Sequence, residues 1–194
     1  MKNYIEVVDD FIPKSYQEEI KKMLFGGKFP WFYSPEISTS DRNDLTDSAP
    51  CHSHLFRSHM RQVYSPDYNF IAPLAMFATN HLNIDFNDVL AARSFLQFPL
   101  SDKFLSRKID SLHTDMPVDH LVCLYYVVDS DGDTIITSFR SDEMNLSPES
   151  YTTDDILAKV TPKQGRAVLF DGRLYHTAEQ PKNNVRCIIN MNII

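Results

Sequence analysis

The sequence has 194 residues, 43% of them hydrophobic, and a formal net charge of −7 at pH 7. This length suffices for a sizeable core, so we expect a single domain over residues 1–194. The negative charge argues against a nucleic-acid backbone as the main partner, because proteins that bind nucleic acid usually carry a basic face. No apolar run approaches the roughly 18 residues of a membrane span, and the N-terminus lacks an apolar signal core. We therefore expect a cytoplasmic protein that is not inserted in a membrane.

Residues 1–88 are expected to form a flank of helices and loops. Apolar residues recur at helical spacing over 16–25, before a Gly-Gly pair, and this pattern predicts a first helix. A second helix is predicted over 70–82, with Pro73 near its first turn. The stretch 34–67 is polar and rich in Ser, Asp and His, so little regular structure is expected there.

Runs of β-forming residues accumulate from Val89 onward. The run 121–128 is followed by an Asp-Gly pair at 131–132 and by a return strand over 135–139, which together predict a β-hairpin. Further strands are predicted over 166–170, 173–176 and 185–194. We therefore expect residues 89–194 to form a jelly-roll, or double-stranded β-helix, with the helices packed on one face. The fold class is mainly β with flanking helices (α+β).

The three cysteines, Cys51, Cys123 and Cys187, are odd in number, and the last two lie inside predicted strands. Reduced, buried thiols are therefore expected in place of a disulfide framework. Cys51 also opens a Cys-His-Ser-His segment near His59 that has metal-ligand residue types. Because this segment lacks a second paired group, it is interpreted as a polar loop and not as a structural zinc site.

His113 and Asp115 are two residues apart, so on an extended strand end their side chains point to the same side and can hold one metal ion. A lone His-x-Asp pair is weak support, but this pair precedes a series of predicted strands that contains His176. Two imidazoles and one carboxylate on one face of a ferrous ion leave the other coordination positions open. Open positions are what an oxygen-activating enzyme needs.

In their order and spacing, these motifs resemble the iron(II)- and 2-oxoglutarate-dependent dioxygenases of the prolyl 4-hydroxylase-like group. The motifs that carry the resemblance are His113-Thr-Asp115, the Tyr125-Tyr126 pair before the Asp-Gly turn, the segment 166–176, and Arg186 ten residues after His176. The opening of the chain, with Val8-Asp-Asp-Phe-Ile-Pro13 and Phe29-Pro-Trp-Phe-Tyr33, is similar as well. The resemblance thus covers nearly the whole chain.

The resemblance implies iron(II) as the metal, 2-oxoglutarate as the cosubstrate and O2 as the oxidant. It implies that His113, Asp115 and His176 bind the iron and are catalytic. Arg186 is the candidate to anchor the distal carboxylate of 2-oxoglutarate, because a guanidinium pairs with a carboxylate bidentately and stays charged when desolvated. Tyr126 is the candidate to donate a hydrogen bond to the same carboxylate, as the second tyrosine of such a pair commonly does in this family.

Neighbouring positions qualify this assignment. Strand alternation allows only one of the two adjacent tyrosines to face the site. Asn190 follows Arg186 by four residues, on the same strand face, and is a candidate to assist it. Gln97 or Phe98 takes the position near the iron-side carboxylate where relatives often carry a tyrosine hydroxyl, so the hydrogen bonding there stays open.

Hydroxylation, with release of succinate and CO2, is the reaction that the resemblance implies. Asp115 argues against the halogenating relatives, which have a small residue in place of the carboxylate. The substrate stays open between a peptide or protein side chain, such as proline, and a small metabolite. The cluster Trp31–Tyr33 and the stretch 34–67 form either a wall and lid that grip a peptide, or core followed by an irregular segment. Two other function classes remain: a non-catalytic jelly-roll module that binds a metal or sugar, and a zinc hydrolase.

Overall fold

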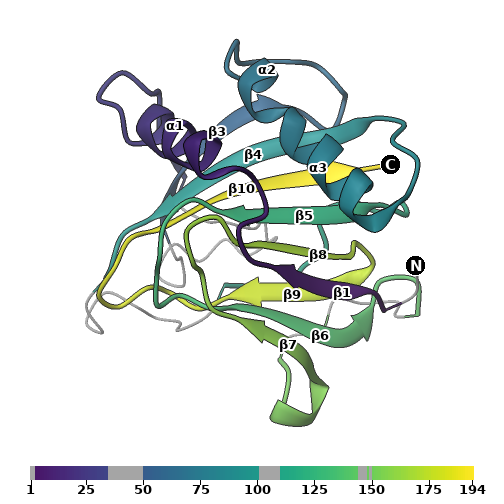
Figure 1. Cartoon of the computed structure of the whole chain (residues 1–194). Helices are drawn as coiled ribbons and strands as arrows, with labels where there is room; N and C mark the ends of the chain where they lie inside the picture. The colour runs from purple at the N-terminus through teal and green to yellow at the C-terminus, as the bar shows by residue number, and fades with distance from the viewer. Residues whose placement is uncertain (1–2, 35–49, 101–109, 144–147, 149) are drawn as a thin grey trace.

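The computed structural model describes residues 3–34, 50–100, 110–143, 148 and 150–194 (Figure 1). Its helices are α1 (Lys14–Leu24), α2 (Tyr68–Ile71) and α3 (Pro73–Leu82), and a short 3-10 helix spans Thr153–Asp155. The larger sheet consists of β1 (Ile5–Val8), β2 (Phe32–Ser34), β3 (Cys51–Arg57), β4 (Val89–Gln97), β5 (Leu121–Tyr126), β8 (Ala167–Asp171) and β10 (Arg186–Ile193). The smaller sheet consists of β6 (Thr134–Arg140), β7 (Ile156–Val160) and β9 (Leu174–Ala178).

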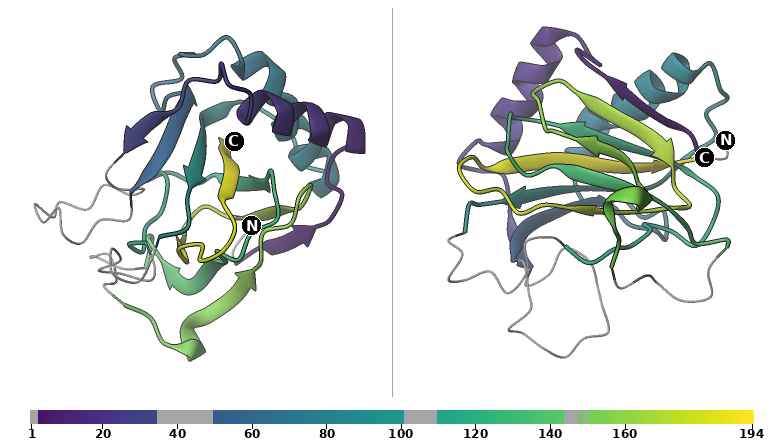
Figure 2. Two further views of the ribbon diagram at one scale, coloured as in Figure 1. Left: turned by 90° about the vertical axis from the view of Figure 1, so that its left-hand side faces the viewer. Right: turned by 90° about the horizontal axis from the view of Figure 1, so that it is seen from below.

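The strand order is β1-β8-β5-β10-β4-β3-β2 in the larger sheet and β7-β6-β9 in the smaller one, and neighbouring strands are antiparallel. Figure 1 shows the smaller sheet below the larger one, and Figure 2 shows from two other sides that the helices cover the opposite face of the larger sheet. This is the jelly-roll with helices on one face that the sequence predicts. Within the described ranges, no helix is long and apolar enough to cross a membrane.

Strand β5 shows how the larger sheet separates two cores. All its residues are buried, and successive side chains point to opposite faces. Tyr125 packs on the helix side, in the same cluster as Ile20 of α1. Tyr126 packs between the two sheets, in the same cluster as Ile136 of β6. Burial on both faces explains the continuous apolar sequence of this strand, and it confirms that only one of the two tyrosines faces the space between the sheets.

Both predicted helices are present. The first is α1, and the second is divided into α2 and α3, with Pro73 at the first position of α3, where its missing N–H costs no hydrogen bond. Residues 1–88, expected as a flank of helices and loops, also supply β1, β2 and β3. Because these strands lie at the two edges of the larger sheet, the flank completes the sheet of the jelly-roll. The three cysteines are free and buried, as predicted.

The expectation of little regular structure over 34–67 is wrong for the second half of this stretch. Residues Cys51–Arg57 form β3, which pairs with β2 on one side and β4 on the other. The side chains of His54 and Phe56 on this strand are buried. The strand is missed because its polar residues are buried by its position in the sheet and not by their own hydrophobicity. Residues 35–49 lie outside the described part of the chain.

The predicted hairpin between β5 and β6 is also wrong. The two strands lie in different sheets, because β8 and β10 occupy both edges of β5. The Asp-Gly pair nevertheless makes a tight connection. The carboxylate of Asp131 accepts hydrogen bonds from the backbone N–H groups of Lys182 and Asn183. A Cβ added to Gly132 would lie only 2.7 Å from the carbonyl oxygen of Glu179, so this position has no room for a side chain. The turn therefore directs the chain from the larger sheet into the smaller one.

Candidate metal centre and its surroundings

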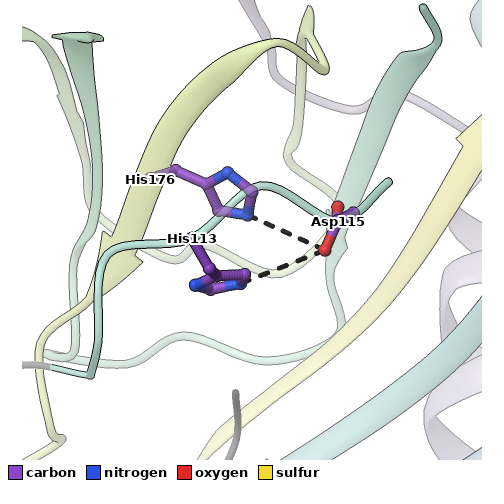
Figure 3. Close-up of side chains that lie close together, drawn as sticks. All are labelled: His113, Asp115 and His176. Atoms are coloured by element: carbon purple, nitrogen blue, oxygen red, sulfur yellow. Dashed lines mark ion pairs between the residues drawn. The ribbon is translucent and has the colours of Figure 1, made fainter. Parts of the chain in front are cut away.

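His113, Asp115 and His176 meet between the two sheets (Figure 3). One ligand atom from each lies within 4.8 Å of the other two. The Nε2 atoms of His113 and His176 are 4.0 Å and 3.9 Å from Oδ1 of Asp115, too far for hydrogen bonds. Among the described residues this is the one group of three or more His, Cys, Asp or Glu side chains that could hold a metal ion. The Cys51 segment, interpreted from the sequence as a polar loop, instead belongs to strand β3, where Cys51 and His54 are buried.

Backbone pairing places the two imidazoles next to each other. His176 lies in the middle of β9, and His113 forms an isolated antiparallel bridge to it. The backbone N–H of each histidine donates to the carbonyl oxygen of the other, at 3.1 Å and 2.9 Å. The ring centroids are consequently 4.4 Å apart. Asp115, two residues beyond His113, completes the same face, as the His-x-Asp spacing predicts.

The hydrogen bond at Nδ1 of each imidazole determines that Nε2 is the nitrogen available to bind a metal. Nδ1 of His113 is 2.9 Å from the carbonyl oxygen of Ser111, and Nδ1 of His176 is 3.3 Å from that of Leu174. A carbonyl accepts only, so each Nδ1 must carry the proton, and each Nε2 presents a lone pair towards Asp115. This arrangement is typical of histidines that bind a metal through Nε2.

The carboxylate of Asp115 is oriented by the last strand of the chain. Its Oδ2 accepts hydrogen bonds from the side-chain amides of Asn190 and Asn192 on β10, both at 3.0 Å. Oδ1 is thereby left facing the two histidines. Burial alone would raise the pKa of Asp115, but the imidazoles of His176 and His113 and the Asn190 amide lower it below its usual value. Asp115 is therefore an anionic oxygen donor at neutral pH.

The protonation state of His176 also suits a metal ligand. Burial, followed by repulsion from His113, lowers the pKa of His176 to about 4. The imidazole is therefore neutral at pH 7 and can donate its lone pair. Two imidazoles and one carboxylate match the donor set of a facial triad for ferrous iron. The residues present thus fit an iron(II) ion.

Arg186 lies at the start of β10 and is only 3% exposed. Its Nε donates to the carbonyl oxygen of Gly132 at 3.0 Å, its Nη1 to Oε1 of Gln97 at 2.9 Å, and its Nη2 to Oγ1 of Thr134 at 2.9 Å. Three of its five N–H groups are thus used by the protein, and two remain for a ligand. Because Arg186 and Asn190 are four positions apart on β10, they share the strand face that holds Asp115.

Tyr126 meets Arg186 through a residue that the sequence analysis does not single out. The hydroxyl of Tyr126 donates to Oγ1 of Thr134 at 2.8 Å, the same atom that accepts from Arg186. Burial raises the pKa of Tyr126 to about 12, so its hydroxyl stays protonated. The two predicted cosubstrate residues therefore lie side by side, with Thr134 between them.

The structure places Gln97 at the Arg186 end and Phe98 at the surface. Gln97 is opposite Arg186 in the β4–β10 pairing and is fully buried, whereas Phe98 is 48% exposed and packs edge-on against His52. Neither side chain contacts the His113–Asp115–His176 group. The hydrogen-bond acceptor of Gln97 instead fixes one side of the guanidinium.

A buried carboxyl near Arg186 also escapes sequence reasoning. Oδ1 of Asp110 accepts a hydrogen bond from Nε2 of Gln180 at 2.8 Å, and its Oδ2 has no hydrogen-bond partner. Burial raises the pKa of Asp110 to about 6, although the charges of Arg186 and His113 oppose the shift. Only its place three residues before His113 marks it in the sequence, and such proximity is no specific signal.

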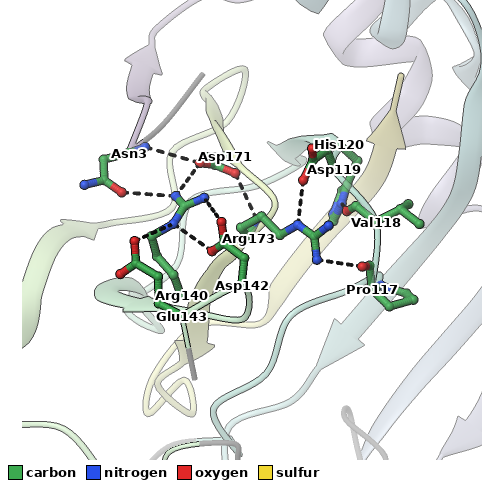
Figure 4. A network of polar contacts seen from close by, with 10 residues as sticks. All are labelled: Asn3, Pro117, Val118, Asp119, His120, Arg140, Asp142, Glu143, Asp171 and Arg173. Carbon is green, nitrogen blue, oxygen red and sulfur yellow. Dashed lines mark hydrogen bonds and ion pairs between the residues drawn. The ribbon is translucent and has the colours of Figure 1, made fainter. Parts of the chain in front are cut away.

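The loop after Asp115 is held by an arginine from the turn between β8 and β9 (Figure 4). Arg173, directly before β9, donates through Nε to the carboxylate of Asp119 at 2.7 Å and through Nη1 to the carbonyl oxygen of Pro117 at 2.6 Å. This contact ties the segment that follows Asp115 to the strand that carries His176. The relative position of the two metal-ligand segments is thus fixed by side-chain contacts as well as by the backbone bridge.

No protein-family model matches the sequence, and no curated protein matches it. Several solved structures have the same fold. The non-heme alpha-ketoglutarate-dependent epimerase SnoN from nogalamycin biosynthesis superposes with a TM-score of 0.64 at 9% identity, over 100% of this chain and 79% of its own. The viral collagen prolyl hydroxylase of Paramecium Bursaria Chlorella virus-1, in its 2OG complex, has a TM-score of 0.58 at 15% identity, over 98% and 95%.

A third similar structure is a prolyl hydroxylase from Trichoplax adhaerens in complex with a peptide fragment of the hypoxia inducible factor oxygen degradation domain. Its TM-score is 0.61 at 13% identity, over 98% of this chain and 83% of its own. At these identities the similarity establishes a shared fold. The chemistry must be argued from the residues of this chain.

Proposed function

We propose that this protein is an iron(II)- and 2-oxoglutarate-dependent oxygenase that acts as one domain over residues 1–194. The observation that carries the proposal is the inner face of β10. At one end of this face Asn190 orients the carboxylate of Asp115, and at the other end lies the buried guanidinium of Arg186. At a rise of about 3.4 Å per residue, these two positions are separated by roughly 14 Å along the strand. A metal site and a carboxylate anchor therefore face the same space between the sheets.

In this proposal, His113, Asp115 and His176 hold iron(II), and the iron together with bound 2-oxoglutarate supplies the chemistry that activates O2. Arg186 and Tyr126 hold the distal carboxylate of 2-oxoglutarate. The remaining N–H groups of Arg186 provide a charge-assisted pair, and Tyr126 provides a neutral donor once its single O–H turns from Oγ1 of Thr134 to the carboxylate. The apolar side chains between the sheets, including Ile188 of β10 and Phe170 of β8, exclude water from this region.

Hydroxylation of a substrate C–H bond, with release of succinate and CO2, is the reaction we propose. Two of the similar structures named above are prolyl hydroxylases, and one was solved with a peptide fragment. Another is an epimerase, so the shared fold alone does not select the outcome. The intact carboxylate of Asp115 supports hydroxylation over halogenation, since halogenating enzymes of this kind lack it.

The test is conversion of 2-oxoglutarate to succinate by the iron-loaded protein, measured with O2 against a panel of peptides and small acids. The proposal expects turnover that requires iron and stops when zinc replaces it. A zinc hydrolase would instead be active with zinc and indifferent to 2-oxoglutarate. A non-catalytic metal- or sugar-binding module would bind ligand without any succinate release.

A further inference from the structure

Arg93 on β4 lies next to the candidate metal centre. In the sheet it is directly opposite Asn190 of β10, whose amide donates to Asp115. Residues directly opposite each other in an antiparallel pair point to the same face, with Cβ atoms about 5 Å apart. The side chain of Arg93 therefore starts on the inner face of the larger sheet, one strand away from the partner of the metal-ligand carboxylate.

The inner face is open to solvent at this position. One row of side chains crosses the sheet from Val168 and Leu124 to Asn190 and Arg93. Val168 and Leu124 are 0% and 3% exposed, Asn190 is half-buried, and Arg93 is exposed. Figure 2 shows β2 and β3 continuing the larger sheet on the β4 side, away from the smaller sheet. Along this row the side chains are therefore buried at Val168 and Leu124 and solvent-exposed at Arg93, next to the metal centre.

Within the described part of the chain, Arg93 has no hydrogen-bond or ion-pair partner. All the other described arginines have at least one acceptor, and they are Arg57, Arg61, Arg140, Arg166, Arg173 and Arg186. A guanidinium binds carboxylates bidentately and keeps its charge in any environment. Arg93 is thus a free cation on an otherwise acidic protein of net charge −7.

On the sides away from Asn190, the neighbours of Arg93 on this face are apolar. Leu55 of β3 is its cross-strand partner and is half-buried. Phe95, two residues along β4, packs against the core between the sheets. Phe32 of β2 lies on the same row as Phe95, through Ser53, and is 62% exposed. A carbon skeleton that lies on these side chains would place a terminal anionic group at Arg93.

We propose that Arg93 binds a carboxylate of the substrate, so that the substrate of this oxygenase is an organic acid. This proposal rests on the proposed function. The planar fork of a guanidinium matches a carboxylate, with which it forms two parallel charge-assisted hydrogen bonds. Arg186 is buried and serves the cosubstrate, while Arg93 is exposed and available to a molecule that arrives from solvent. The substrate carboxylate would therefore lie no farther from the backbone of Arg93 than the length of an arginine side chain. The backbone of Arg93 is next to the metal centre.

The experiment compares the binding of matched acids and amides. The probes are the N-acetylated standard amino acids, each as the free acid and as the primary amide. The probes are added to protein loaded with iron(II) and 2-oxoglutarate in the absence of O2, so that no turnover consumes them. Binding is first screened by saturation-transfer NMR, and the affinities are then measured by calorimetric titration. We expect at least one acid to bind the wild type about tenfold or more tightly than its amide, because a charge-assisted hydrogen bond is lost in the amide.

Arg93→Gln should bring the acid down to the affinity of the amide, and Arg93→Lys should keep part of the preference, because lysine retains the charge without the planar fork. Lys22→Gln removes the same charge from the exposed surface of α1, where the side chain is 78% exposed, and should change nothing.

Three results would overturn the proposal. The first is a wild type that prefers no acid over its amide, and the second is a preference that survives in Arg93→Gln. The third is a tenfold loss of 2-oxoglutarate affinity in Arg93→Gln, which would make Arg93 a cosubstrate ligand. If iron or 2-oxoglutarate fails to bind, it is the proposed function that fails, and the same acid and amide comparison on metal-free protein still decides the role of Arg93.

Discussion

The amide of Asn192 lies 3.0 Å from Oδ2 of Asp115, although the two residues are 77 positions apart in the sequence. Asn190 makes the same contact at the same distance. The last strand of the chain therefore orients the carboxylate of the candidate metal centre. Such outer contacts fix the direction of a ligand and raise its affinity for the metal.

Replacement of Asn192 by alanine should weaken iron(II) binding by about tenfold or more, because Oδ2 of Asp115 loses one of its two donors. Anaerobic titration with iron(II) measures the effect. Asn80→Ala, on the exposed surface of α3, is the matched control and should bind iron as the wild type does. Wild-type affinity in Asn192→Ala would show that Asp115 is oriented without this contact.

Arg186→Leu should raise the apparent 2-oxoglutarate requirement by at least about tenfold, because a lost charge-assisted pair is worth on the order of 1.5 to 3 kcal/mol. Iron binding should stay nearly unchanged. The substitution also removes the donor to the acceptors on Gly132 and Gln97 and one of the two donors to Thr134, so thermal unfolding must be recorded alongside. Arg186→Lys keeps the charge, so its 2-oxoglutarate requirement should lie between those of the wild type and Arg186→Leu. Unchanged 2-oxoglutarate affinity in a folded Arg186→Leu protein would move the anchor elsewhere.

Tyr126→Phe should have a smaller effect of the same kind, about two- to fivefold on the 2-oxoglutarate requirement, because it removes one neutral donor and no charge. The hydroxyl donates to Thr134, so Thr134→Val should show a related loss by releasing both Tyr126 and Arg186. The measurement is the dependence of succinate formation on 2-oxoglutarate concentration. An effect of Tyr126→Phe larger than that of Arg186→Leu would reverse the assigned roles.

Asp110 should make folding stability depend on pH. Burial raises its pKa from 3.8 to about 6, so the folded protein holds this proton more tightly than the unfolded chain does. Its stabilising contribution is complete below pH 3.8 and is lost as pH rises through about 6. Between these limits the shift corresponds to about 3 kcal/mol. The difference in unfolding free energy between wild type and Asp110→Asn, from urea denaturation of metal-free protein at pH 4.5 and 7.5, should move against the wild type at the higher pH. A difference that is independent of pH would contradict this.

The local parts of the site are readable from sequence, and the long-range parts are not. His113 and Asp115 are two residues apart, so their spacing alone predicts that they share a face, although in the structure they lie in an isolated bridge and a bend and not on a strand end. Thr134 and Asn192 contribute through contacts between residues distant in sequence, which no local spacing encodes. From the sequence, Asn190 is expected to assist Arg186 on the same strand face, but its contact is with Asp115.

In the fold, too, local features can be predicted from the sequence, whereas features that depend on long-range contacts cannot. The apolar period predicts α1 and the strands β5, β6, β8, β9 and β10, because burial on one or two faces leaves a trace in the sequence. The Asp-Gly pair marks a turn correctly, but a turn does not specify whether the next strand pairs with the previous one. That choice depends on β8 and β10, which take both edges of β5 from distant parts of the chain. Strand β3 is missed because its half-polar sequence is buried only once β2 and β4 lie beside it.

The most direct test of the metal centre is Asp115→Ala, because its carboxylate is the one anionic donor among the three candidate metal ligands. Iron(II) binding and 2-oxoglutarate turnover are measured on the same preparation, with Asp154→Ala, an exposed surface carboxylate, as the control. The account predicts that Asp115→Ala abolishes turnover and weakens iron binding while the control keeps both. Full 2-oxoglutarate turnover by a folded Asp115→Ala protein would contradict the assignment of His113, Asp115 and His176 as the metal centre.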